Sequence, residues 1–201
     1  MKQTRTTRVK DERKKIELLA AARQVMKEKG MEDMTITEIV RRAGVAQGTF
    51  YLYFPSKTSL VVALAEEMLQ SALERVMAET EGLTAPSAFI DKAVPAAFQQ
   101  FGLYSDVYPI LNNGGGFVKD AAQWDQLFEP FYSYVSLLLG KWQEEQLIDG
   151  RMNPEFAARM VVSLIEQAVE DCYLYRPDVD AAAYLADLIY FIRKALGIRE
   201  A

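Results

Sequence analysis

Glycine and proline divide the segment from Thr35 to Lys57 so closely that it has room for only two short helices. The segment reads "TITEIVRRAGVAQGTFYLYFPSK". Gly44 ends the first helical run. The second run ends before Pro55, because a proline pushes the preceding residue out of the α region, and Phe54 is therefore expected to be extended. Any fold of this chain must include a short helix, a turn and another short helix at this point.

Capping patterns predict where the neighbouring helices begin. "TITE" matches a capping box, in which the Thr35 hydroxyl accepts from the Glu38 amide and the Glu38 carboxylate accepts from the Thr35 amide. Ser56 can cap the following helix. Upstream, apolar residues recur at helical spacing over 10–29, and Gly30 stands where a left-handed residue commonly ends a helix. The N-terminal part therefore predicts three helices.

The rest of the chain has helical signals and neither strand-like alternation nor an internal repeat. Pro130 is expected to kink a long helix, and 106–116, which contains "NNGGG", predicts a bend. The predicted helices span residues 57–81, 86–102, 119–145, 154–175 and about 180–197. The sequence thus predicts an all-α fold with about nine helices.

Composition limits the chemistry that the chain can perform. It has no histidine and one cysteine, Cys172. These counts exclude internal disulfides, zinc sites built from Cys and His, and His-based catalysis. We therefore expect no catalytic residues, no metal, no cofactor and no enzyme activity, with Cys172 buried in a helix of a cytoplasmic protein. No apolar run approaches the length of a transmembrane helix, so no membrane partner is expected.

Charge is unevenly distributed along the chain. The net charge is −5, but residues 1–57 carry 13 Lys and Arg against 7 Asp and Glu, whereas residues 58–201 carry 10 against 21. A basic N-terminal part on an acidic body suggests that the N-terminal part meets a polyanion.

Two short helices joined by a glycine-containing turn, with a supporting helix before them, form a helix-turn-helix unit, and its second helix enters the major groove of DNA. The first turn of that helix holds Gln47, Gly48 and Thr49. Glutamine can bond an adenine edge, threonine can serve a phosphate or a thymine methyl, and glycine lets the backbone approach DNA closely. These three residues are therefore candidate DNA contacts.

The aromatic residues that follow suggest phosphate contacts and a packed face. Tyr51 and Tyr53 offer hydroxyls to phosphates, and Lys57, at a helix start, offers its ammonium and nearby backbone amides. Phe50 and Phe54, four residues apart, are expected to pack inward. The alternative interpretation is structural: the tyrosines are half-buried core residues and Lys57 is a solvated charge.

As a string, "TITEIVRRAGVAQGTFYLYFPSKTSL", Thr35 to Leu60, resembles the DNA-binding domain of the TetR family of bacterial transcriptional regulators. That family's usual signature has a Thr, an Ile-Ala pair, "AGVS", "GT", "YxYF" and "SK" before a leucine. The resemblance implies DNA contacts at Thr37, Gln47, Gly48, Thr49, Tyr51, Tyr53 and Lys57, with Leu52 close by.

Two positions depart from the family pattern. Val40 replaces a small alanine, which should alter packing only. Ala46 stands where serine is usual, so a helix cap and a phosphate hydroxyl are both missing, and loss of such a cap typically costs about 1 kcal/mol.

The resemblance also implies an overall layout. It divides the chain into a basic arm and helix-turn-helix domain at 1–56, with the motif at about 35–54, and a domain for effector binding and dimerisation at 57–201. In this family the C-terminal helices form a ligand pocket, and the last two pair with their copies in a homodimer.

Half of the aromatic residues, 11 of 22, lie between residues 98 and 142. Aromatic walls with a few polar groups suit a small-molecule cavity, although an ordinary aromatic core has the same composition. Glu166 would favour a cationic or hydroxyl-bearing ligand if it pointed into the cavity, and the alternative is a solvated charge. The candidate effector-binding residues are Phe98, Phe101, Tyr104, Tyr108, Phe117, Trp124, Phe128, Tyr132 and Glu166.

Apolar faces on the last two predicted helices exceed what one domain must bury, which predicts a homodimer. The expected interface residues are Val161, Leu164, Ile165, Ala168, Val169, Leu185, Leu188, Ile189 and Ile192.

These features favour a ligand-responsive regulator of transcription, most simply a repressor that a small hydrophobic or aromatic effector releases from DNA. A dimer would read a near-palindromic operator in double-stranded DNA, with Arg5 and Arg8 of the basic arm adding contacts. The rival interpretation is a DNA-binding regulator without a small-molecule effector, which responds to a protein partner or acts constitutively.

Overall fold

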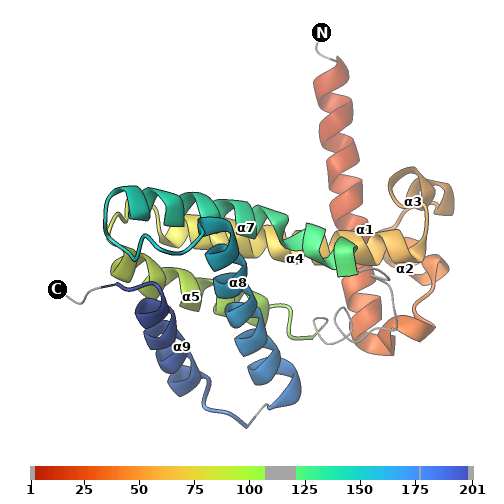
Figure 1. Ribbon diagram of the computed structural model, residues 1–201. Coiled ribbons are helices and arrows are strands. Elements are labelled where there is room, and N and C mark those ends of the chain that lie inside the picture. The colour runs from red at the N-terminus through yellow and green to blue at the C-terminus, as the bar shows by residue number, and fades with distance from the viewer. Residues whose placement is uncertain (1–2, 107–120, 177, 199–201) are drawn as a thin grey trace. The chain divides into compact units, whose positions relative to one another are not determined.

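The computed structural model describes residues 3–106, 121–176 and 178–198, with side chains in all of these except residues 3–11 and 121–124. These residues form α-helices and no strand, which confirms the predicted all-α class (Figure 1). The helices are α1 (Gln3–Asp33), α2 (Ile36–Ala43), α3 (Gln47–Tyr53), α4 (Lys57–Glu79), α5 (Pro86–Gly102), α7 (Ala121–Glu144), α8 (Pro154–Glu170) and α9 (Ala181–Ala195), with a π-helical turn η1 (Asp171–Tyr175) after α8.

The first helix is longer at both ends than its apolar spacing predicts. It begins at Gln3, so the basic arm is helical from there on, whereas the expected start was residue 10. Gly30 has φ 76° and ψ 179°, which interrupts the helix as expected, but one more turn follows up to Asp33. That turn adds carbonyl groups at a helix end, where partners within the helix are missing.

Local sequence signals account for the two short helices. The Thr35 hydroxyl accepts from the Glu38 amide at 3.3 Å, which caps α2 as predicted. Gly44 ends α2 in the left-handed region at φ 66°, and Phe54 is extended as expected. The second half of the predicted capping box differs, because the Glu38 carboxylate accepts from Lys29.

The later helix starts also follow their sequence signals. Ser56 caps α4, since its hydroxyl accepts from the Ser59 amide at 3.1 Å. Asn153 caps α8 and Asp180 caps α9 in the same way. α7 contains Pro130 within its bounds. The bend predicted at 106–116 lies outside the described residues except for Asp106.

The chain forms two compact units, and the division falls inside α4, after Glu67. In its described part, the first unit contains residues 3–67 and Asp106. Its core is made by α1, α2, α3 and the start of α4. The residues at most 1% exposed there are Leu18, Ala22, Val25, Met26, Met34, Ile39, Phe50, Leu60 and Ala65.

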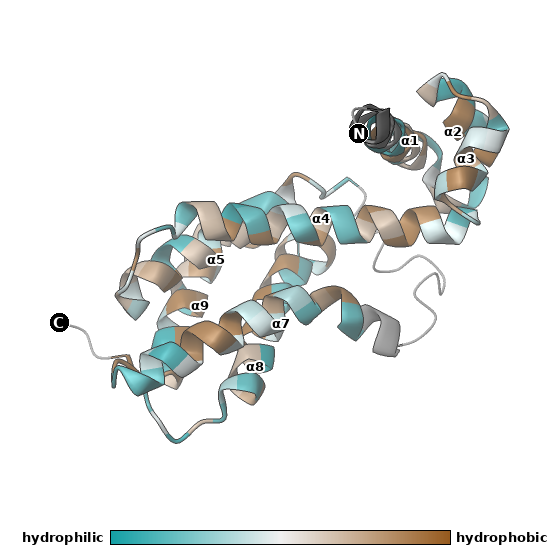
Figure 2. Ribbon diagram, turned by 90° about the horizontal axis from the view of Figure 1, so that it is seen from above, coloured by the Kyte–Doolittle hydropathy of each residue, from teal (hydrophilic) through white to brown (hydrophobic). Residues whose placement is uncertain are grey.

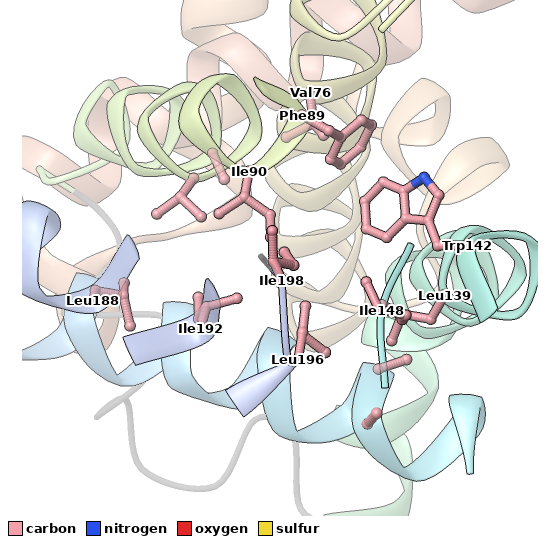
Figure 3. Close-up of a cluster of buried hydrophobic side chains, with 14 of the residues drawn as sticks. Val76, Phe89, Ile90, Leu139, Trp142, Ile148, Leu188, Ile192, Leu196 and Ile198 are labelled. Carbon is pink, nitrogen blue, oxygen red and sulfur yellow. The ribbon is translucent and has the colours of Figure 1, made fainter. Parts of the chain in front are cut away.

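The second unit, residues 68–105 and 121 onward, has its own apolar core. Its helices carry both hydrophobic and hydrophilic residues, as expected for helices that bury one face (Figure 2). The rings of Phe89 on α5 and Trp142 on α7 meet edge to face with centroids 5.3 Å apart. Figure 3 shows that Ile90, Leu188 and Ile192 belong to the same cluster. α5, α7, α8 and α9 therefore share one core.

No helix in the described part of the chain is long and apolar enough to cross a membrane.

Candidate nucleic-acid interface and apolar cavity

α3 has one buried side and one exposed side. Phe50 and Phe54 are 0% and 2% exposed, with ring centroids 5.6 Å apart, and they anchor α3 to the core of the first unit. On the other side, Tyr51 is 51% exposed and Leu52 is 82% exposed. Gln47 at the start of the helix is exposed as well. The inward packing predicted for the two phenylalanines is confirmed.

Gly48 lies on this exposed side, in the first turn of α3. No described atom lies within 4 Å of the place where a Cβ would stand, and its φ is not positive. A glycine is therefore not required here by the packing or the backbone of the described chain. Something outside the chain must favour it, or the glycine is simply tolerated.

The other predicted contacts lie around this helix. Thr37, near the start of α2, is exposed, while Thr49 and Tyr53 are half-buried. The Tyr53 ring lies 6.4 Å from that of Phe54, centroid to centroid. The exposed members of the set are thus on α2 and α3 of one compact unit, and their contact with DNA stays a prediction.

Lys57 makes contacts within the chain that the sequence did not predict, and its contact with DNA stays a prediction. Its ammonium donates to the carbonyl oxygens of Met31 at 3.0 Å, Glu32 at 3.4 Å and Met34 at 3.0 Å. The sequence interpretation directed this ammonium to a DNA phosphate. The structure instead directs it to the end of α1, which the spacing of the motif gave no means to foresee.

Two ion pairs connect α1 to α2. The Arg42 guanidinium donates to both carboxylate oxygens of Glu28, at 2.5 and 2.6 Å, and Lys29 pairs with Glu38. Hydrogen bonds from these partners lower the pKa values of Glu28 and Glu38 from their ordinary value. Sequence reasoning missed the Arg42 pair, because the two residues are 14 positions apart and on different helices.

A third ion-pair cluster involves Asp106 in the same unit. Arg23 lies 2.9 Å and Lys27 3.4 Å from its carboxylate. Burial raises the pKa of Asp106, but the hydrogen bonds and charges of Arg23 and Lys27 outweigh it and lower the pKa overall. Asp106 is therefore held to α1 as an anion.

The second unit encloses an apolar cavity of about 70 Å³. Its walls come from α4, α5, α7, α8 and α9. Glu166 on α8 is the one charged side chain among the described lining residues, which are Val76, Phe89, Ile90, Ala93, Val94, Ala97, Phe101, Phe128, Phe131, Tyr134, Val135, Leu138, Leu139, Trp142, Val161, Val162, Ile165, Glu166, Ile192 and Leu196. A mostly apolar lining of this kind favours an apolar occupant.

Three of the predicted effector residues, Phe101, Phe128 and Glu166, line this cavity. Phe98 and Tyr104 are buried elsewhere in the unit, and the Phe98 ring packs on Tyr173 at 5.0 Å. Tyr108 and Phe117 lie outside the described residues, as does the side chain of Trp124. The aromatic cluster therefore only partly coincides with the cavity wall.

Tyr132 lies away from the cavity, in a surface groove between α7 and α8. The guanidinium of Arg159 stands 4.3 Å from the centre of its ring. Burial raises the pKa of Tyr132, nearby Asp125 and Glu166 raise it further, and Arg159 opposes them. The sequence interpretation placed Tyr132 in the cavity wall, but in the structure Tyr132 lines the groove instead.

The predicted dimer residues are largely used within the chain itself. Ala168, Val169, Leu188 and Ile192 are at most 7% exposed in the single chain, so they have little surface to offer a second copy. Their contact with a second copy stays a prediction. Val161 and Ile165 line the cavity, and Leu164, Leu185 and Ile189 pack against the core of the unit. The reason is that α8 and α9 must first cover their own core.

The outer faces of the same helices carry other apolar residues. Phe156 and Met160 on α8 are 63% and 65% exposed, and Tyr190 and Phe191 on α9 are 59% and 58% exposed. They are absent from the predicted interface residues because the prediction followed one apolar stripe on each helix, and that stripe packs against the core of the unit.

Comparison with known proteins shows which family has this architecture. The family model described as bacterial regulatory proteins, tetR family, matches residues 18–64, and the model described as the tetracyclin repressor-like C-terminal domain matches residues 90–196. The HTH-type transcriptional regulator YvdT of Bacillus subtilis is 28% identical over 181 residues, which are 90% of this chain and 93% of YvdT.

Solved structures have the same fold. The fatty acid degradation regulator FadR of Bacillus halodurans superposes with a TM-score of 0.75 at 19% identity, over 92% of this chain and 97% of that one. FadR of Bacillus subtilis, solved in complex with stearoyl-CoA, has a TM-score of 0.73 at 16% identity, over 88% and 96% of the two chains. The chain therefore belongs to the TetR family of bacterial transcriptional regulators, and it is a DNA-binding regulator and not an enzyme.

Proposed function

We propose that this chain is a repressor that binds a near-palindromic operator as a homodimer and leaves it when a small apolar effector enters the cavity of the second unit. The observation that carries the proposal is the pairing, in one chain, of an exposed recognition face on α3 with an apolar cavity lined by a single described carboxylate. Neither feature is explained by the stability of the fold alone.

The exposed face of α3 supports the DNA part of the proposal. Gln47 is assigned to a base edge, and Thr37, Thr49, Tyr51 and Tyr53 to phosphates or the neighbouring groove. Leu52, which is 82% exposed, is assigned to the same face, where an apolar side chain can contact a thymine methyl. Gly48 allows the backbone to approach between these contacts.

The composition of the cavity supports an effector with an apolar body. Phe101 and Phe128 provide aromatic wall, and Glu166 provides one acceptor for a hydroxyl, amide or cationic group. Two structurally similar regulators were solved in complex with acyl-CoA ligands: FadR of Bacillus subtilis with stearoyl-CoA and FadR of Thermus thermophilus with lauroyl-CoA. An acyl chain is therefore the first class of ligand to test.

The size of the cavity favours the rival function. Sites for small molecules typically enclose roughly 300–1,000 Å³, whereas this cavity encloses about 70 Å³. An effector of ordinary size requires the surrounding helices to move apart, and it releases DNA only as far as it prefers that opened state. A regulator without a small-molecule effector needs no such movement.

For the dimer, we propose the outer faces of α8 and α9, with Phe156, Met160, Tyr190 and Phe191 at their centre. Large apolar side chains that are mostly exposed on neighbouring helices are typical of a surface that associates. A two-fold interface would supply two copies of α3, one for each half of a near-palindromic operator.

The experiment compares the wild type with Ala93→Leu, which adds bulk inside the cavity. A fluorescent duplex selected from a random library by the wild-type protein is titrated with lauroyl-CoA, stearoyl-CoA or coenzyme A alone. We expect the acyl compounds to raise the melting temperature and to release DNA, with coenzyme A inactive. For Ala93→Leu, both effects should require at least about tenfold more acyl compound, because overpacking of a filled site costs on the order of 1–3 kcal/mol.

Ala182→Leu, the same change at an exposed position of α9, serves as the matched control and should respond as the wild type does. If no acyl compound shifts either property, and Ala93→Leu binds DNA as the wild type does, the function without a small-molecule effector is supported instead.

A further inference from the structure

One pair of stacked rings lies between the apolar cavity and the surface groove of α7 and α8. Phe128 lines the cavity, and Tyr132, one turn further along α7, lines the groove. Their ring centroids are 6.2 Å apart, with 27° between the ring planes. Glu166 on α8 lines the cavity, and burial together with the charges of Asp125 and Glu166 raises the pKa of Tyr132. The cavity and the groove therefore meet at one seam between the two helices.

The groove supplies space that the cavity lacks. It encloses about 400 Å³, whereas the cavity encloses about 70 Å³. Sites for small molecules typically enclose roughly 300–1,000 Å³, so only the groove has room for a ligand of ordinary size before any helix moves. Because the groove lies at the surface, a ligand that collects there faces the Tyr132 ring directly.

Arg159 on α8 holds the Tyr132 ring on the groove side. Its guanidinium stands 4.3 Å from the ring centre, which is within the range of a cation–π contact. Two carboxylates of α7 fix the guanidinium in turn, that of Asp125 at 2.5 Å and that of Glu129 at 3.7 Å. All three charged side chains are about half exposed, and ion pairs at such sites are weak. These contacts can therefore break and re-form without the unfolding of either helix.

The backbone of α7 is weakened at the same place. Pro130 lies within α7, between Phe128 and Tyr132. A proline has no amide hydrogen, so the carbonyl of Gln126 loses the bond that residue 130 would otherwise donate to it. Helices bend most readily at such positions. The seam thus combines a helix that can bend with side-chain contacts that can be released.

We propose that the seam between α7 and α8 is the entry to the cavity, with Tyr132 as the side chain that closes it and Arg159 as the residue that holds Tyr132 in place. The inference rests on the function proposed above, in which an apolar group enters the cavity. When the guanidinium leaves the ring and α7 bends at Pro130, an acyl chain passes from the groove along Phe128. Tyr132 and Arg159 control this passage and do not determine how tightly the chain is held.

A residue that closes an entry affects the kinetics of binding differently from a residue that contacts the bound ligand. Opening the entry speeds association and dissociation by the same factor, and the equilibrium affinity stays the same. Loss of a contact with the ligand acts mainly on dissociation. A residue that only stabilises the fold lowers the melting temperature and alters neither rate.

The test measures both rates by stopped-flow fluorescence. The chain has two tryptophans, so a Trp124→Phe background leaves Trp142, which lines the cavity, as the reporter. The probe is lauroyl-CoA with a bromine atom at the far end of its acyl chain, which quenches Trp142 when the chain reaches the cavity, and coenzyme A alone is the blank. We expect Arg159→Met and Tyr132→Ala to bind and release the probe about tenfold faster, with an unchanged Kd, because the cation–π contact is lost. Pro130→Ala should slow both rates, since the restored hydrogen bond stiffens α7.

Two variants of the same kinds serve as matched controls. Arg151→Met also removes an arginine that is paired with an aspartate, but Arg151 does not line the groove. Pro95→Ala removes the proline inside α5. Both should keep the rates of the wild type. Slower exchange of the probe in Pro95→Ala and not in Pro130→Ala would place the opening at α5 and overturn the proposal.

Quenching with the same two rates in Arg159→Met, Tyr132→Ala and the wild type refutes the entry and leaves the proposed function intact. A change in dissociation alone also overturns the entry, because it identifies these residues as ligand contacts. If the probe quenches Trp142 in none of the proteins, no acyl chain reaches the cavity, and the acyl effector of the proposed function fails together with its entry. Should Tyr132→Ala not fold, Arg159→Met, which changes an exposed residue, decides the question.

Discussion

Gly48 is the residue at which helix stability and DNA contact favour different side chains. In the first turn of α3 a glycine weakens the helix by roughly 0.5–1 kcal/mol relative to alanine. The space that a methyl group would occupy is open in the described chain. An alanine is thus tolerated by the isolated protein, and only a partner that approaches the backbone closely would exclude it.

Gly48→Ala is therefore expected to raise the free energy of unfolding by up to about 1 kcal/mol and to lower affinity for the selected duplex on the order of tenfold, which corresponds to about 1.4 kcal/mol. Chemical denaturation and fluorescence anisotropy measure the two effects. Gly140→Ala is the matched control, because Gly140 lies within α7 and also has open space at its Cβ position. Gly140→Ala should stabilise the protein and leave DNA binding unchanged. If Gly48→Ala binds the selected duplex as tightly as the wild type does, DNA does not approach the backbone closely at this residue.

At the scale of single elements, α3 depends on packing more than on its own ends. Ala46 has the extended backbone of a capping residue (φ −75°, ψ 151°) but makes no side-chain bond to the helix. The glycine at the second position adds to this weakness. Phe50 and Phe54, which are buried against the first unit, supply the compensating contacts.

Ala46→Ser should raise the free energy of unfolding by about 1 kcal/mol, since serine at this position can accept from an amide in the first turn of α3. Thermal denaturation measures it, and Asn153→Ala, which removes the cap of α8, should shift stability by a similar amount in the opposite direction. A serine that leaves both stability and amide exchange in α3 unchanged would show that packing alone determines the first turn.

Signals within one turn of the chain predicted most element boundaries. The caps at Thr35, Ser56 and Asn153 and the helix end at Gly44 were predicted from local chemistry and are confirmed. Contacts between distant residues could not be predicted. The bonds from Lys57 reach back 23 to 26 positions, and nothing in the motif shows which carbonyls the ammonium meets.

Side-chain direction was the other obstacle to prediction. Phe128 and Tyr132 are one helical turn apart on α7, yet only Phe128 lines the cavity. Choosing between them requires the positions of α5 and α8. The dimer face meets the same difficulty, because a helix with apolar residues on two sides gives no indication of which side packs on its own core.

At the scale of the whole molecule, association is assigned to the outer faces of α8 and α9. Phe191→Glu should convert the protein to monomers at micromolar concentration and weaken its binding to the selected duplex at least about tenfold, because two linked recognition helices act at a raised effective concentration. Sedimentation velocity measures the first effect and anisotropy the second.

Leu103→Glu provides the comparison, since Leu103 is 64% exposed and lies outside both helices. It should remain dimeric. If Phe191→Glu forms dimers as stable as those of the wild type, the interface lies on another surface.

The two faces of α8 have a consequence for the redesign of ligand preference. Val161, Val162 and Ile165 line the cavity from one face, while Phe156 and Met160 lie on the opposite face, where we place the second copy. A mutation on this helix that reshapes the cavity also disturbs the surface behind it, so specificity and assembly cannot vary independently there. α5 contributes Ala93 and Ala97, two small residues whose enlargement changes the cavity from the side away from the proposed partner. New effector preferences are therefore more accessible through α5 than through α8.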